Sequence, residues 1–199
     1  MKIICLLAPH LPVQVERRRD PGLDGQPLVV GGLPWDPGAV LDCCRDATAV
    51  GVRPGMRLSR AEALCPSARF LPADEAAYQA AHRTLDQIPR QFTGRVETAG
   101  LGLLFADGSG MERAIGSDAR LARHVAREAE RASGLDVRVG LAGDRFTAEQ
   151  AARAAPAAGW CPVPPGQEQA FLSPLPLSTL PAEPEVLRRL HLLGVHTLG

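Results

Sequence analysis

The hydrophobic positions fall into short runs separated by longer amphipathic stretches, a pattern that predicts a mixed α/β fold. Apolar runs typical of buried strands cover residues 3–8, 27–31, 39–41, 69–71, 95–107 and 136–141. Helical spacing of apolar positions covers residues 11–19, 43–50, 59–65, 74–92, 115–133, 144–154 and 184–193. The proline-rich residues 156–184 are expected to form a connection.

The chain is organised around residues 95–107, which predict two short strands meeting at a corner. The apolar runs 96–99 and 101–105 are interrupted by Gly100 and Gly102. Glycine accepts backbone conformations that other residues avoid, so it suits an irregular corner. We therefore expect a buried hairpin here and not a helix.

Local signals predict where several helices begin and end. Ser59 and Glu62 have the spacing of a capping box, which predicts a helix that begins at Ser59. Asp144 is the expected N-cap of the helix that follows it. Gly51 stands where a left-handed residue would end the preceding helix. The expected buried face of the helix that ends near residue 133 is formed by Ile115, Leu121, Val125 and Ala129.

Composition indicates a globular chain with no overall charge. The 199 residues are 45% hydrophobic and carry 22 basic and 22 acidic side chains. A balanced charge excludes binding to nucleic acid through a general basic excess, so any contact with DNA must be local. The exposed helix face expected to carry Arg120, Arg123, Arg127 and Arg131 is interpreted as solvated, since acidic residues are interspersed.

Cysteine and hydropathy patterns place the chain in a reducing compartment. The 5 cysteines include no CxxC pair, which favours free thiols in a cytosol. The apolar run over residues 3–8 ends at Pro9 and is shorter than the roughly 7–15 residues of a secretory signal. We expect a buried first strand, and no stretch approaches the length of a membrane span.

Several stretches, in order along the chain, resemble the Y-family of translesion DNA polymerases and their UmuC-like domain. They are residues 15–31, 51–56, 61–66, the helix containing Tyr78, 137–141 with the Asp144 helix, and 171–199. The resemblance implies an α/β (α+β) fold in which a palm with an antiparallel sheet, residues 1–12 and 74–165, carries inserted fingers at 13–73. Residues 166–199 would begin a helical thumb, so we expect a piece of a longer protein.

The residues at the family's metal-binding positions are not metal ligands. The first strand of the family carries two aspartates, and the matching positions here are Leu7 and Pro9. The adjacent Asp and Glu of the hairpin match Gly102 and Leu103. Two-metal phosphoryl transfer needs oxygen ligands. The resemblance therefore predicts no metal, no cofactor and no enzymatic activity.

The family's nucleotide-binding positions are also altered. They match Pro12, Arg45 and Thr48, which predicts no nucleotide site. Arg45 could meet a phosphate, but an ion pair with Asp42 or Asp46 is the preferred interpretation. The candidates for contact with DNA phosphates are Arg53, Arg57, Arg60 and Arg145, the last of which matches the family's lysine after the late palm strand.

This pattern of loss resembles a catalytically inactive subgroup, the ImuB type. The subgroup implies a cytoplasmic, nucleoid-associated adaptor in mutagenesis induced by DNA damage, as part of the SOS response. Its expected partners are an error-prone C-family DNA polymerase, a RecA-like accessory protein and the sliding clamp, through regions beyond this chain. Primer-template DNA is a further expected partner, and a membrane is not.

Two other functions stay open from the sequence. One is an active translesion nucleotidyltransferase that uses displaced carboxylates, for which Glu97 and Asp107 are candidates. The other is a thiol enzyme built on the adjacent Cys43 and Cys44, which would need a lowered cysteine pKa. The preferred interpretation of Cys44 is a small packing residue.

Overall fold

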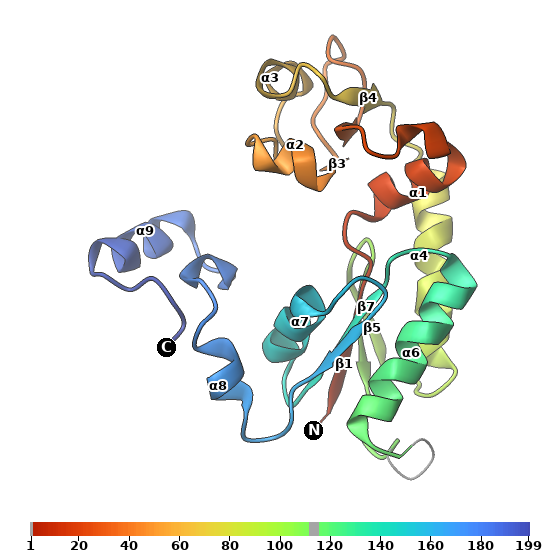
Figure 1. Ribbon diagram of the computed structural model, residues 1–199, viewed down its shortest axis with the longest axis vertical. Coiled ribbons are helices and arrows are strands. Elements are labelled where there is room, and N and C mark those ends of the chain that lie inside the picture. Colours follow the sequence, from red (N-terminus) through yellow and green to blue (C-terminus); the bar gives the residue numbers. More distant parts are fainter. Residues whose placement is uncertain (1, 112–115) are drawn as a thin grey trace.

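The computed structural model describes residues 2–111 and 116–199 and contains two sheets joined by helices (Figure 1). The larger sheet has the strand order β5-β6-β1-β7-β8, and the smaller has the order β3-β2-β4. The strands are β1 Ile3–Leu7, β2 Leu28–Val30, β3 Asp42–Cys43, β4 Arg69–Leu71, β5 Val96–Gly100, β6 Leu103–Asp107, β7 Arg138–Ala142 and β8 Trp160–Pro162. The predicted α/β fold with a mostly antiparallel large sheet is therefore confirmed.

Strand β1 lies at the centre of the large sheet because both of its faces are apolar. It pairs antiparallel with β6 and with β7, so its backbone is satisfied on both edges. Ile4 and Leu6 are buried in the main core, while Cys5 and Leu7 belong to a second apolar cluster. The register places Leu7 opposite Leu103 on β6.

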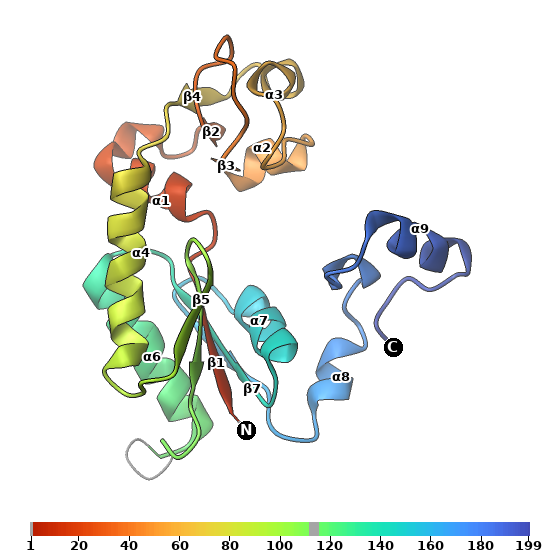
Figure 2. The same ribbon diagram turned by 180° about the vertical axis from the view of Figure 1, so that it is seen from behind.

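Helices cover both faces of the large sheet, as Figures 1 and 2 show from opposite sides. Helices α4 (Glu75–Arg90) and α6 (Asp118–Ser133) lie on one face, and α7 (Arg145–Ala154) lies on the other. Asp144 caps α7 as predicted, since its side chain accepts the N–H of Thr147. On α6, Leu121, Val125 and Ala129 are buried as expected. The predicted role of Ile115 lies outside the described residues.

The small sheet and its helices form the lobe at the top of Figure 1. Helix α1 (Leu11–Arg19) and the short turn η1 (Pro21–Leu23) lead into it from β1, and helices α2 (Arg45–Ala49) and α3 (Leu58–Leu64) pack beside it. Gly51 follows α2 with a positive φ of 101°, as its predicted place at the helix end requires.

The C-terminal segment extends from the large sheet on the side of α7 (Figure 2). It contains α8 (Glu168–Leu172), η2 (Leu177–Thr179) and α9 (Pro184–Leu192). Of the helices in the described part of the chain, none combines the length and the apolar character that crossing a membrane requires.

Three local predictions were wrong. The run at 39–41 forms only an isolated bridge between Ala39 and Arg57, and the strand comes later, at Asp42–Cys43. Helix α3 begins at Leu58, ahead of Ser59, with Arg57 as its N-cap and no side-chain cap. The supposed connection 156–184 contributes β8, which pairs parallel with β7. Pro162 is tolerated in β8 because this strand lies at the sheet edge.

Candidate nucleic-acid interface

A cleft of about 490 Å³ lies where the end of β1 meets helices α1 and α2. Its lining is dominated by arginine and by residues next to the ends of β1 and β7. The lining residues are Leu7, Pro9, His10, Val13, Gln14, Arg17, Cys44, Arg45, Asp136, Arg138 and Arg153. The lining carries four guanidinium groups and the carboxylate of Asp136, and Asp24 and Glu149 also pair with two of these arginines. The charge that remains is positive and suited to phosphate.

The arginines of the cleft differ in how they are held. Arg138 pairs with Asp136 at 2.9 Å, and Arg153 pairs with Glu149, one turn earlier on α7, at 2.7 Å. Arg17 donates to the carbonyl of Gln26, and its Nε lies 3.9 Å from a carboxylate oxygen of Asp24. Arg45 is exposed and makes no ion pair with any described residue, so the predicted pair with Asp42 or Asp46 was wrong.

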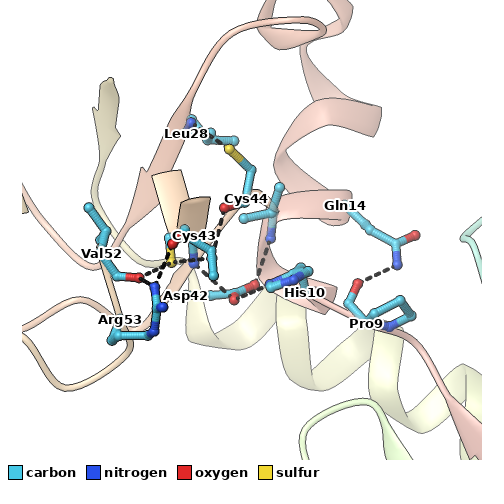
Figure 3. A network of polar contacts seen from close by, with 11 residues as sticks. Pro9, His10, Gln14, Leu28, Asp42, Cys43, Cys44, Val52 and Arg53 are labelled. Atoms are coloured by element: carbon cyan, nitrogen blue, oxygen red, sulfur yellow. Dashed lines mark hydrogen bonds and ion pairs between the residues drawn. The ribbon is translucent and has the colours of Figure 1, made fainter. Parts of the chain in front are cut away.

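The carboxylate of Asp42 is used inside the protein, where it joins the lobe of the small sheet to the start of α1 (Figure 3). One oxygen lies 3.0 Å from Nδ1 of His10 and accepts the N–H of Cys43 at 2.9 Å. The other accepts the N–H of Val13 at 3.4 Å. Since Asp42 is only 8% exposed, these partners replace the water that the carboxylate has lost. This is why Asp42 does not reach Arg45.

We expect Asp42→Ala to lower the free energy of unfolding by about 2–3 kcal/mol, because it leaves buried N–H groups without an acceptor. Urea unfolding followed by circular dichroism measures the loss. Asp46→Ala is the matched control, since Asp46 is exposed on the first turn of α2 and is expected to cost less than about 1 kcal/mol. Equal losses in the two variants would contradict the role of Asp42.

The sheet corner beside the cleft is apolar. Leu7 and Leu103 face each other in the register of β1 and β6, and both pack with the cluster that contains Phe105. Pro9 and Gly102 are the other two of the four positions that the sequence resemblance matches to the family's metal ligands. None of these four side chains contains oxygen, so the residues present do not fit a two-metal site at this corner. Across residues 2–111 and 116–199, no group of three or more His, Cys, Asp or Glu side chains is arranged to hold a metal ion.

The backbone at Gly102 is also adapted to glycine. Its φ is +77°, and a Cβ atom added there would lie 2.8 Å from the carbonyl oxygen of Ala8. That approach exists because the Gly102 carbonyl accepts the N–H of Ala8 at 2.8 Å. A side chain at this position would require the corner to move.

His82, which sequence reasoning did not single out, holds the corner from α4. Its Nδ1 accepts the N–H of Gly102 at 3.1 Å, and its Nε2 lies 3.4 Å from the Thr98 hydroxyl. Burial lowers the pKa of His82, which keeps the ring neutral and Nδ1 free to accept. The only sequence signal was its spacing from Tyr78 and Leu85, which places it on the buried face of α4.

Glu97 and Arg145 form an exposed pair on the same face of the sheet as Leu7 and Leu103. Arg145 donates to both carboxylate oxygens of Glu97, at 2.8 and 2.9 Å. Its guanidinium carbon also lies 4.4 Å from the centre of the Phe105 ring. Asp107, the other acid considered, accepts the N–H of Ser109 and pairs with Arg95. These contacts lower the pKa of Asp107, the Ser109 hydrogen bonds most.

Two other residues, which the resemblance matches to the family's nucleotide-binding positions, have structural roles. Pro12 is buried in the first turn of α1. The hydroxyl of Thr48 donates to the carbonyl of Cys44 at 3.0 Å. The thiol-enzyme alternative finds no support, because burial raises the pKa of Cys43, whereas a nucleophilic thiol needs a lowered one. Cys44 is buried, as its interpretation as a packing residue requires.

The arginines predicted to contact DNA are placed differently from one another. Arg53 donates to the carbonyls of Thr48 and Val52 at 2.5 and 2.7 Å, so it closes the end of α2. Arg57 and Arg60 are exposed at the start of α3 and make no ion pair with any described residue. They line a shallow depression with Gly55, Met56 and Ser59.

Comparison with solved structures supports the polymerase-like fold. All of this chain superposes on 59% of the DinB protein of Sulfolobus solfataricus, with a TM-score of 0.87 and 26% identity. It also superposes on the Dbh DNA polymerase in an insertion ternary complex, with a TM-score of 0.82 and 26% identity, again covering 59% of that chain.

Sequence comparison points to the same group. The model of the impB/mucB/samB family matches residues 8–153. A DNA polymerase IV of Dehalococcoides mccartyi is 32% identical over 94% of this chain and 48% of its own length. One from Desulfatibacillum aliphaticivorans is 35% identical over 92% of this chain and 46% of its own length. The chain thus spans about half the length of these curated relatives.

These relatives contradict the prediction that the protein is not an enzyme, because each is named as a DNA polymerase. That prediction was drawn from four positions. The side chains at these positions cannot bind metal ions at this corner. They give no information on whether carboxylates elsewhere in the protein support catalysis. With the family model matching most of the chain and the whole fold superposing on polymerase structures, the chain belongs to the impB/mucB/samB family of Y-family DNA polymerases.

Proposed function

We propose that this chain is the palm-and-fingers part of a translesion-synthesis protein that binds primer-template DNA along the arginine-lined cleft. The observation that carries the proposal is the cleft itself, in which Arg17, Arg45, Arg138 and Arg153 gather although the chain as a whole has no net charge. The Dbh DNA polymerase, which superposes on the whole chain, has been solved as a ternary complex. We assign residues 1–12 and 74–165 to the palm, 13–73 to the fingers and 166–199 to the thumb.

Arg45 is the best test of this proposal because its guanidinium makes no ion pair with any described residue, so replacing it breaks no such contact within the protein. On duplex DNA each neutralised phosphate contributes about −0.9 to the slope of log affinity against log salt. We expect Arg45→Ala to make the slope less negative by about 0.9 and to weaken binding severalfold at low salt, for all DNA sequences alike. Fluorescence anisotropy with a labelled primer-template measures both quantities.

Arg127→Ala is the matched control. Arg127 is likewise exposed and without an ion pair to any described residue, but it lies on α6, on the sheet face opposite α7. It should change neither the slope nor the affinity. An Arg45→Ala variant that behaves like the control would mean that the cleft does not meet the DNA backbone.

We also propose that the full-length protein transfers nucleotides, as its polymerase relatives do, with a carboxylate displaced from the usual corner. Glu97 supports this choice, because it lies opposite Phe105 on the face that carries Leu7 and Leu103. It is also held by Arg145, which matches the family's lysine. Asp107 is the less suitable carboxylate, because it lies four residues from Leu103 along β6, about 13 Å away.

Primer extension by the full-length protein, with Mg²⁺ or Mn²⁺ supplied, tests nucleotide transfer. We expect extension that Glu97→Gln abolishes, with Asp107→Asn as the control that retains it. Extension that survives Glu97→Gln would rule out this carboxylate. No extension with either ion would contradict the proposed transfer while leaving DNA binding untouched.

The similarity of this chain to translesion polymerases supports a further proposal about partners, which does not depend on whether the protein transfers nucleotides. We infer a cytoplasmic, nucleoid-associated protein that acts after DNA damage beside an error-prone C-family polymerase, a RecA-like accessory protein and the sliding clamp. Regions outside residues 1–199 would make these contacts. Co-purification of the full-length protein with each partner, compared with this chain alone, is the test.

A further inference from the structure

The fingers lobe exposes a tryptophan that the cleft does not use. Trp35 is 77% exposed, although it is among the largest apolar side chains of the protein. Trp160, the other tryptophan, packs against the core. An indole ring in water forgoes a large burial energy, so its exposure on an ordered loop points to a ligand with a flat apolar surface.

The loop that carries Trp35 is fixed by its own hydrogen bonds. Asp36 accepts the N–H of Leu33 at 2.7 Å through its side chain, and its own N–H donates to the Leu33 carbonyl at 2.9 Å. Gly32 and Gly38 both pack against the Leu58 side chain, which is 1% exposed. Trp35 is therefore presented by a built turn, which limits the entropy lost when a ligand orders the ring.

Two arginines that have no ion pair within the described part of the chain lie beside this turn. The Gly38 carbonyl accepts the N–H of Leu58, and the neighbouring Ala39 forms a bridge with Arg57. Gly38 is three positions after Trp35 in the chain, at most about 11 Å away. Arg57 and Arg60 line the adjoining depression without an ion pair to any described residue. Asp36, the acid of the loop, is occupied by the Leu33 N–H.

We propose that Trp35, Arg57 and Arg60 form a binding site for single-stranded nucleic acid, in which Trp35 stacks on an unpaired base and the arginines contact the adjoining phosphates. An aromatic face beside free guanidinium groups is the combination that holds single strands without reading their sequence. The inference rests on the proposed function and extends it, because it adds a contact for the unpaired strand, separate from the cleft.

Intrinsic fluorescence tests the stacking directly. In a Trp160→Phe background Trp35 is the one remaining tryptophan, and Phe keeps an aromatic ring in the core. Titration with oligothymidylate should quench its emission to saturation.

Affinities measured by anisotropy test the contribution of each side chain. Trp35→Ala should weaken the affinity for the oligonucleotide about tenfold, and Trp35→Phe should retain most of it. The affinity of Trp35→Ala for blunt duplex DNA should stay within twofold of the affinity of the unchanged chain. Arg57→Ala with Arg60→Ala should reduce the salt slope on the single strand by about 1.4.

The outcomes separate this site from the cleft. Quenching together with the selective loss of single-strand affinity supports the site. Unquenched Trp35, or single-strand affinity unchanged in Trp35→Ala, overturns the site even where blunt duplex still binds, and the cleft proposal then stands. Duplex binding that Arg45→Ala leaves unchanged, with Trp35 quenching intact, contradicts the cleft and leaves the site supported.

Discussion

Gly140→Ala should lower the free energy of unfolding by more than about 3 kcal/mol, the largest effect we expect from any single methyl group. Helix α7 lies so close to β7 that a Cβ atom on Gly140 would stand 1.9 Å from the Ala148 carbonyl oxygen and 2.4 Å from the Ala152 nitrogen. Both neighbours are helix backbone, so relief requires α7 to move as a unit. Since a domain is stabilised by only about 5–15 kcal/mol, the variant should show a much lower urea midpoint.

Gly100→Ala is the control for this prediction. Gly100 also lies in a strand of the large sheet, but no atom lies within 4 Å of its added Cβ and its φ is not in the left-handed region. It should be neutral or slightly stabilising, because alanine restricts the unfolded chain. A Gly140→Ala midpoint equal to that of Gly100→Ala would show that α7 is not seated on the β7 backbone as described.

Gly102→Asp, which restores a carboxylate at the hairpin corner, should cost about 2–4 kcal/mol of stability. The left-handed conformation contributes about 1–3 kcal/mol, and the contact of the new Cβ with the Ala8 carbonyl adds a steric cost. Urea unfolding measures the total. The corner would therefore have to rearrange before a carboxylate could occupy this position.

Gly102→Ala distinguishes the two causes of that loss. It carries the same Cβ and the same strain without a charge, so a loss similar to that of Gly102→Asp is expected. If only the Asp variant were destabilised, burial of charge would be the cause. If neither were destabilised, the corner would not be built around glycine.

Much of the fold follows from local sequence, and the exceptions have identifiable causes. The apolar runs of β1, β2, β4 and β6 predicted strands correctly because burial selects them. The other strand of the hairpin, β5, was also predicted, but it lies at the sheet edge with residues 97–99 exposed, so the expectation of a fully buried hairpin was wrong. Strand β3 was misplaced because its first residue is Asp42, a polar residue that only tertiary contacts with His10 and Val13 make compatible with burial. Strand β8 was not predicted because its proline suggested a connecting segment. Proline is compatible with a strand at the edge of a sheet, and β8 lies there.

The candidate site was predictable only in part. Resemblance alone directed attention to Leu7 and Gly102, and the cross-strand register shows that Leu7 and Leu103 are neighbours. The support of Gly102 by His82 joins a helix to a hairpin corner, and no local pattern encodes such a contact. An ion pair between Arg45 and Asp42 depends on the direction of the Asp42 side chain. That direction is set by tertiary contacts, so the sequence alone could not predict it.

The most direct test of the account is the salt dependence of primer-template binding by this chain, measured by fluorescence anisotropy at a series of salt concentrations. Cleft binding predicts measurable affinity at low salt and a slope of log affinity against log salt of about −3 or steeper, made shallower by Arg45→Ala and not by Arg127→Ala. No binding at low salt, or a slope near zero, would contradict the proposal that this cleft holds DNA.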